Sequence, residues 1–136
     1  MLGGCVSGGS QTFSYAHQGN PNTVCADQFG IADIQVLRAK MPILPGQMPT
    51  RAMLDINETP TAQETRAITL LDTAIHNCQT LRATAGHATS ASEDILEVRV
   101  GKLRRALSNG EIPYAVYNYG LAKILKRHAA FMAQGE

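Results

Sequence analysis

Histidine and methionine are residue types that could bind a metal ion in this chain, and their spacing indicates whether the sequence supports a metal site. The histidines are scattered, and no two lie four residues apart on one helix face: they are His17, His76, His87 and His128. A zinc site needs three or four converging ligands, which this spacing does not supply. Met41, Met48 and Met53 are soft donors suited to copper(I), but methionine is far more often a core filler. We therefore predict no metal site and no cofactor.

The patterns that support catalysis are also missing from the sequence. No serine lies in a Gly-x-Ser-x-Gly motif, and no glycine-rich phosphate loop stands between a strand and a helix. The acidic group Glu93, Asp94 and Glu97 falls near the start of an expected helix, where carboxylates complement the helix dipole. We predict that the chain is not an enzyme.

The three cysteines lie at positions 5, 25 and 78, and none is part of a C-x-x-C motif. The sequence therefore gives no support for a thioredoxin-type redox centre, a c-type haem site or the usual zinc spacing. Leu2-Gly3-Gly4-Cys5 resembles a bacterial lipobox, in which the cysteine is lipidated and becomes the mature N-terminus. Only Met1 precedes it, whereas an export signal has a charged and an apolar region there. Either the chain begins inside its signal peptide or the match is accidental.

Residues 1–22 have the composition of a flexible tether, because glycine, serine and asparagine are frequent between Val6 and Asn22. Such a tether would span roughly 20–25 Å, enough to hold a domain away from a lipid surface. We expect lipid on Cys5. The alternative is a disordered cytoplasmic N-terminus with an unused cysteine.

An odd number of cysteines in an exported protein needs an explanation. If Cys5 carries lipid, Cys25 and Cys78 are left to form a disulfide, which would close a loop of about 50 residues and stabilise the fold by roughly 4 kcal/mol. The alternative is two buried, reduced cysteines in a cytoplasmic protein.

The composition indicates one all-α domain over residues 23–136. Hydrophobic residues make up 44% of the 136 residues, but aromatic residues only 5%, so the core must use Leu, Ile, Val, Ala and Met. These residues favour helix–helix packing. No run approaches the roughly 18 apolar residues of a membrane-spanning helix. We expect four main helices in a small antiparallel bundle.

The first helix is predicted over 23–40, with Ile34 and Leu37 on its apolar face and Gly30 weakening its middle. The second begins at Thr59-Pro60 or at a Thr61/Glu64 capping box and ends at Gly86. Its apolar stripe is Ala67, Ile68, Leu71, Ala74, Ile75 and Cys78.

The third helix is predicted from a capping box at Ser90 and Glu93 to 108–110, and the fourth from Pro113 to about Ala133. The short connection between them predicts an antiparallel hairpin. The inner face of the fourth helix is predicted to carry Tyr114, Tyr117, Leu121, Ile124, Leu125, His128 and Phe131.

A connector with four prolines, residues 41–60, separates the first two helices. Its many apolar residues predict an ordered segment that packs across the bundle, with a short helix over 51–56 capped by Thr50. Ordered long loops are often functional, so this is one of two expected binding regions.

The other expected binding region is the hairpin from Arg99 to Arg127, where a single acid, Glu111, accompanies seven basic residues. These are Arg99, Lys102, Arg104, Arg105, Lys123, Lys126 and Arg127. On a shared face they would favour an anionic partner: lipid head groups, an acidic protein patch or nucleic acid. The alternative is an ordinary solvated helix face.

Two passages, Pro60-Thr61-Ala62-Gln63-Glu64 and the segment from Leu107 to Asn118, are together similar to an uncharacterised family of small exported, lipoprotein-like helical proteins of Gram-negative bacteria. The second passage also resembles short C-terminal helical hairpins for which oligomerisation has been proposed. The similarity spans most of residues 25–127. It implies export and a helical fold, and it supplies no catalytic residues.

The sequence thus favours a non-catalytic lipoprotein of the periplasm with a binding or structural role towards a protein partner. Ser7, in place of aspartate at the second position after Cys5, favours the outer membrane. The alternative is a cytoplasmic interaction module that binds nucleic acid or an acidic partner through residues 99–127. That alternative predicts a free Cys78 and salt-dependent binding, whereas export disfavours nucleic acid.

Overall fold

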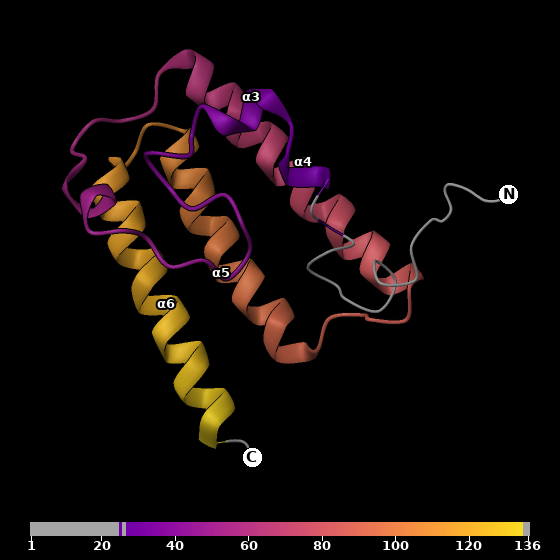
Figure 1. Cartoon of the computed structure of the whole chain (residues 1–136). Helices are drawn as coiled ribbons and strands as arrows, with labels where there is room; N and C mark the ends of the chain where they lie inside the picture. The colour runs from indigo at the N-terminus through magenta and orange to yellow at the C-terminus, as the bar shows by residue number, and fades with distance from the viewer. Residues whose placement is uncertain (1–24, 26, 135–136) are drawn as a thin grey trace, which may run out of the picture.

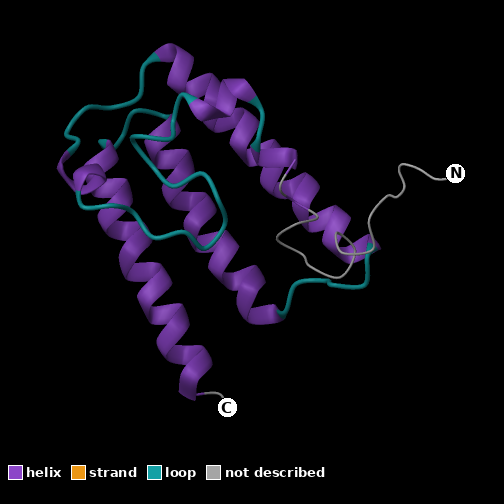
Figure 2. Ribbon diagram, viewed as in Figure 1, coloured by secondary structure: helices purple, strands orange, loops and turns teal. Residues whose placement is uncertain are grey.

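The computed structural model describes Cys25 and residues 27–134, and this part of the chain is helical without strands (Figures 1 and 2). The elements are α3 (Ala32–Gln35), the 3-10 helix η1 (Ala52–Asp55), α4 (Ala62–Thr84), α5 (Ala91–Ser108) and α6 (Tyr114–Gln134). The predicted all-α class is therefore confirmed. The predicted tether and Cys5 lie outside the described residues.

Helix α4 begins at the predicted capping box. The Thr61 hydroxyl accepts a hydrogen bond from the Glu64 backbone N–H at 3.1 Å, and the Glu64 carboxylate accepts one from the Thr61 N–H at 3.1 Å. This exchange satisfies two donors that the first helical turn leaves without partners. The alternative start at Thr59-Pro60 is wrong, because Thr61 is the N-cap residue.

Helix α5 also begins as predicted, with Ser90 and Glu93 forming the second capping box. Both α4 and α5 end at glycines with positive φ, Gly86 at 87° and Gly110 at 76°. The N–H groups of these glycines and of the residues after them bond back to carbonyls of the last helical turn, which is the Schellman arrangement. The predicted ends of the two helices are thus confirmed.

The predicted hairpin of α5 and α6 is present, with the two helices side by side in Figure 1. Gly120 allows their close approach, because a Cβ atom added there would lie 2.8 Å from a Leu103 methyl group. The inner face of α6 is buried at Tyr114, Tyr117 and Leu121. Phe131 was predicted on this face but is 60% exposed, because the last turns of α6 extend beyond the helices packed against it.

The continuous first helix predicted over 23–40 is wrong within the described residues. Helical structure stops at Gly30 and Ile31, resumes in α3 and gives way to turns after Gln35. Ile31, the N-cap of α3, is extended with φ −65° and ψ 130°. Glycine is costly inside a helix, and Pro42 ahead forbids its continuation. Ile34 and Leu37 are nonetheless fully buried, as predicted.

Three long helices, and not four, make up the framework of the described residues. Helix α4 contacts α3 and α5, α5 contacts α6, and α6 contacts η1. Figure 1 shows α4 diverging from the α5–α6 hairpin, with the connector crossing in front of the hairpin. No described helix is long and apolar enough to span a membrane.

The connector is ordered by its contacts with α6. The carbonyls of Ile56 and Glu58 accept hydrogen bonds from the Ala115 and Tyr114 N–H groups at the start of α6. The buried Asn118 amide donates to the carbonyls of Lys40 and Met53 at 2.9 and 3.0 Å. These bonds satisfy backbone groups that would otherwise be buried without partners. The predicted ordered connector with a short helix within 51–56 is therefore confirmed, but the N-cap of η1 is Arg51 and not the predicted Thr50.

Candidate functional site

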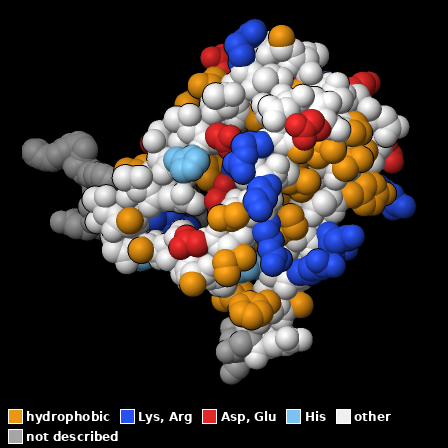
Figure 3. Space-filling view, turned by 180° about the vertical axis from the view of Figure 1, so that it is seen from behind, with side chains coloured by type: hydrophobic (Ala, Val, Ile, Leu, Met, Phe, Trp, Pro, Cys, Tyr) orange, Lys and Arg blue, Asp and Glu red, His pale blue; other side chains and the backbone are white. Residues whose placement is uncertain are grey.

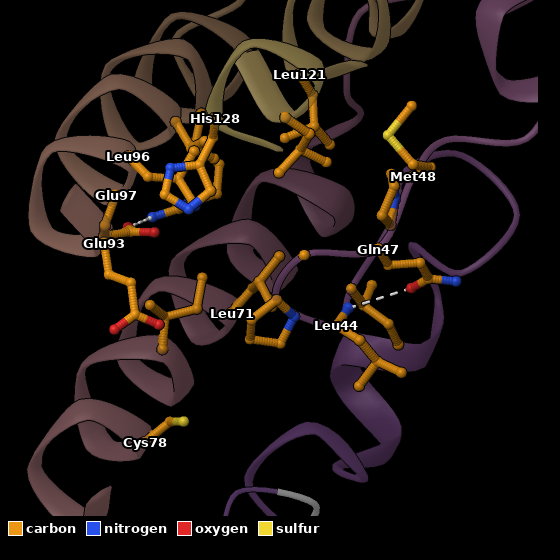
Figure 4. Close-up of a pocket in the computed structure, with 18 of the residues that line it drawn as sticks. Leu44, Gln47, Met48, Leu71, Cys78, Glu93, Leu96, Glu97, Leu121 and His128 are labelled. Atoms are coloured by element: carbon orange, nitrogen blue, oxygen red, sulfur yellow. Dashed lines mark hydrogen bonds and ion pairs between the residues drawn. The ribbon is translucent and has the colours of Figure 1, made fainter. Parts of the chain in front are cut away.

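A cleft of about 720 Å³ opens between the connector segment 42–48 and helices α4, α5 and α6 (Figure 4). Its floor is apolar and comes from all three helices: Leu71 and Ile75 of α4, Val100 of α5, and Leu121 and Leu125 of α6. A volume and lining of this kind are typical of ligand or peptide sites. We call this feature the cleft.

One wall of the cleft is a tight turn over Leu44, Pro45, Gly46 and Gln47. The Gln47 N–H donates to the Leu44 carbonyl at 3.1 Å, and Gly46 has φ 79°. Proline followed by a glycine of positive φ is the pattern of a type II turn. Leu44 is 50% exposed and Met48 42% exposed, so the predicted packing of these two connector residues is incomplete. In Figure 4 they lie across the cleft from Leu96 and His128.

Charged side chains line the rim of the cleft. Arg82 of α4 and Glu93 of α5 form an ion pair at 3.7 Å that links these two helices. Lys126 and His128 lie on the α6 side. The cleft therefore combines an apolar floor with a rim of both charges.

A second cavity, of about 680 Å³, also borders this turn and is lined further by Cys25, Phe29 and Met41. Cys78 lines both cavities. Cys25 and Cys78 are joined by a disulfide with a Cα–Cα distance of 5.1 Å, within the usual range. The predicted pair is thus present, and it attaches the segment before α3 to the middle of α4 beneath the turn.

Arg104 was predicted to bind a partner, and its position corrects that prediction. It is only 3% exposed. Its Nε donates to the Asp72 carboxylate at 2.5 Å and its Nη2 to the Glu97 carboxylate at 2.6 Å. Although burial alone would lower the pKa of Arg104, the carboxylates of Glu97 and Asp72 outweigh it and raise that pKa. Arg104 is therefore an internal link between α4 and α5.

The sequence contains a signal for this burial. Arg104 lies four residues after Val100 and three before Leu107, which places it on the buried stripe of α5. Asp72 adjoins Leu71 of the buried stripe of α4, so helical spacing also indicates that Asp72 lies near the buried Arg104. Burial also raises the pKa of the neighbouring Tyr117 to about 12, which keeps its hydroxyl neutral.

A second internal cluster joins Lys40, directly before the connector, to α4 and α6. Lys40 Nζ lies 2.8 Å from the Glu64 carboxylate, and the Tyr114 hydroxyl donates to the same carboxylate at 2.9 Å. Burial would raise the pKa of Glu64, but hydrogen bonds from Lys40, the Thr61 backbone and Tyr114 outweigh it and lower that pKa. The pKa of Tyr114 is raised, first by burial and then by Glu64.

The other six predicted basic residues are exposed on α5 and α6. Arg105 lies beside Gly101, where an added Cβ atom would be 3.8 Å from its Nη1 and 3.7 Å from the Glu97 carboxylate. Four others, Arg99, Lys102, Lys123 and Arg127, point away from the cleft, since the cleft is lined by other helical positions such as Val100 and Leu121. We call this surface the basic face. In Figure 3, viewed from behind, Lys and Arg side chains gather in a column. Lys126 lies instead at the cleft rim.

Among the described residues, no group of three or more His, Cys, Asp or Glu is arranged to hold a metal ion. The His76 ring lies 2.9 Å from the Asp72 carbonyl, within its own helix.

Comparisons with known proteins give no relative of this chain: no family model matches it, and no curated protein or solved structure is significantly similar. The resemblance of residues 25–127 to small exported helical proteins stays a prediction.

Proposed function

We propose that this protein is a non-catalytic binding protein whose cleft holds an amphipathic helix of a protein partner. The observation that carries the proposal is the incomplete helical layer: three long helices surround an apolar floor, and the connector covers only part of it. A partner helix with apolar residues at spacings of three and four would fill this space.

The uncovered end of the cleft supports a helical occupant. Leu96 and Leu125 are only partly buried along it. Leu44 and Met48 on the opposite wall are exposed large hydrophobic residues. An apolar stripe on a partner would remove part of this surface from water at roughly 25 cal/mol for each Å² buried.

Four of the charged groups that line the cleft, Arg82, Glu93, Glu97 and Arg104, support binding over catalysis. Arg104 is held by Asp72 and Glu97, and Arg82 is paired with Glu93. A catalytic acid or base must be able to reach a substrate, whereas the side chains in these ion pairs are held by one another within the fold.

Photo-crosslinking tests this use of the cleft. A photoreactive phenylalanine at Met48, on the cleft wall, is expected to capture a partner peptide whose apolar residues follow helical spacing. The same group at Val116, an exposed residue on the outer side of α6, is the matched control and is expected not to capture that peptide.

A Met48→Asp change is expected to abolish the complex, and Val116→Asp is expected to leave it intact. Equal capture from both positions would reject the cleft as the binding site. Capture by Met48 of the chain's own residues 1–24 would show that the occupant is internal and would reject a partner helix.

We further propose that the protein is an exported lipoprotein of the bacterial envelope, with Cys5 lipidated. Leu2–Cys5 and the pairing of the other two cysteines support this location. The intact mass of the natively expressed protein, before and after reduction with alkylation, tests it. We expect an acylated N-terminus at Cys5 and two thiols that appear only on reduction. An unmodified chain with three free thiols would place it in the cytoplasm.

A further inference from the structure

The charges of the chain are strongly segregated along its length. Before Arg99 there are five basic and nine acidic residues, whereas from Arg99 onward there are seven basic and two acidic. Arg99, Lys102, Lys123 and Arg127 form the basic face, and Figure 3 shows Lys and Arg side chains gathered on the surface seen from behind. Among the described residues, none of these four side chains forms an ion pair, while Lys40, Arg82 and Arg104 do. The basic face is therefore a surface of uncompensated positive charge.

Apolar side chains are interleaved with these cations on the same outward surfaces. Ile95 and Val98 of α5 and Val116 and Tyr119 of α6 are all exposed large hydrophobic residues. On α5, Ile95 lies four residues before Arg99 and Val98 four residues before Lys102, so cations and aliphatic groups share one helix face. Tyrosine is enriched where a membrane meets water, because its ring is apolar and its hydroxyl is polar.

We propose that the basic face binds the surface of an anionic phospholipid membrane. Cations on this face would meet the phosphate groups of the lipids, and the aliphatic and Tyr119 side chains would enter the boundary between head groups and acyl chains. Nucleic acid offers phosphates but no apolar layer for Ile95, Val98 and Val116, so it matches only half of the surface.

This binding mode would also fix an orientation. The basic face and the cleft lie on opposite sides of the α5–α6 hairpin, because they use opposite helical positions. A molecule lying on a membrane by its basic face would keep the cleft open to the aqueous side. The inference needs neither lipid on Cys5 nor the proposed helical partner.

Flotation of the unlipidated full chain with vesicles tests the inference. Vesicles of phosphatidylglycerol mixed with phosphatidylcholine are expected to bind the protein at low ionic strength, and vesicles of phosphatidylcholine alone are not. The R99Q/K102Q/K123Q variant is expected to bind the anionic vesicles about 100-fold more weakly, since each cation near such a surface contributes roughly a factor of five.

The matched control is R38Q/R51Q/R66Q, which removes the same charge from exposed residues on other segments. It is expected to bind like the wild type. Far-ultraviolet circular dichroism of both variants checks that the helices persist. Equal weakening by both variants, or no binding of the wild type to anionic vesicles, would overturn the proposal.

A second pair of measurements separates a membrane from other polyanions. The I95S/V98S variant keeps every charge and is expected to bind vesicles about tenfold more weakly while its weak binding to a DNA duplex is unchanged. Tighter binding to the duplex than to the vesicles, with no effect of I95S/V98S on vesicle binding, would reject the membrane in favour of nucleic acid. Met48→Asp is expected to leave vesicle binding unchanged, so failure of the cleft proposal is distinguishable.

Discussion

Arg104 is a cation inside an apolar core. We expect stability to change by different amounts when the cation is removed and when its two carboxylate partners are removed. Removing both carboxylates with D72N/E97Q leaves the buried guanidinium unpaired, which is expected to lower the free energy of unfolding by about 3–5 kcal/mol. R104M keeps an apolar stem and leaves carboxylates that reach solvent, so its expected cost is below about 2 kcal/mol. Urea denaturation measures both.

The control for this comparison is D55N/E58Q, which changes two exposed acids outside any ion pair of the described residues. Its expected effect is within about 0.5 kcal/mol. If R104M costs as much as D72N/E97Q, then lost packing, and not the unpaired charge, explains the role of Arg104.

Glu64 is expected to make stability depend on acidic pH. Hydrogen bonds from Lys40, Thr61 and Tyr114 lower its pKa in the folded state below the ordinary value of 4.5. Its ionised form therefore stabilises the fold above pH 4.5, and this contribution is lost as the pH falls through the lowered pKa. Glu64→Gln keeps a capping residue at the start of α4 but removes the charge.

Urea denaturation across a pH series measures this contribution. The gap in unfolding free energy between the wild type and E64Q is expected to be largest near neutral pH and to close in acid. Lys40→Met is expected to reduce the same gap, because it removes one of the bonds that lower the pKa. An unchanged gap throughout the series would show that Glu64 acts only as a cap.

At the scale of elements, the turn at Leu44–Gln47 forms one wall of the cleft, so the backbone conformation of this turn helps to determine the shape of the cleft. Gly46 has φ 79°, and no atom lies within 4 Å of a Cβ added there, so the cost of a side chain is conformational. Gly46→Ala is expected to lower the unfolding free energy by about 1–2 kcal/mol. Gly46→Asn is expected to cost less, since asparagine tolerates this region better. Thermal unfolding of the two variants gives the comparison, and equal costs would argue against a left-handed requirement.

The sequence predicts those elements whose signals are local. The two capping boxes and the glycines that end α4 and α5 bind their own backbone neighbours, so their residue types are sufficient. The prediction of a continuous first helix was wrong because the helix propensity of residues 23–40 is weak. Gly30 and Pro42 also divide this part of the chain into short pieces.

The candidate site was predictable only in part, because it depends on contacts between distant segments. The connector was identified as a binding region from its apolar residues, but the divergence of α4 from α5 and α6 that opens the cleft has no local signal. The basic residues were found from composition. The helical spacing of α5 already distinguishes Arg104, whereas only the three-dimensional arrangement separates Lys126 from the exposed cations on the outer side of the hairpin.

At the scale of the whole molecule, the disulfide holds two parts of unequal intrinsic stability together. Helices α4, α5 and α6 have long packed faces, whereas α3 has four residues and depends on its contact with α4. Cys25 and Cys78 are 53 residues apart. Their link restricts the unfolded chain by about 4 kcal/mol in the chain-entropy model. The disulfide is therefore expected to govern how firmly the segment before α4 stays on the framework.

The C25S/C78S variant tests this dependence. We expect its unfolding free energy to fall by about 4 kcal/mol, while circular dichroism retains the signal of the three long helices. Hydrogen exchange is expected to accelerate first around Ile34 and Leu37, because these buried residues belong to the segment that the disulfide anchors. The wild type in a reducing agent is expected to behave like the variant. If exchange instead accelerated uniformly through α4, α5 and α6, the N-terminal segment would be an integral part of one cooperative unit, and the disulfide would stabilise the bundle as a whole.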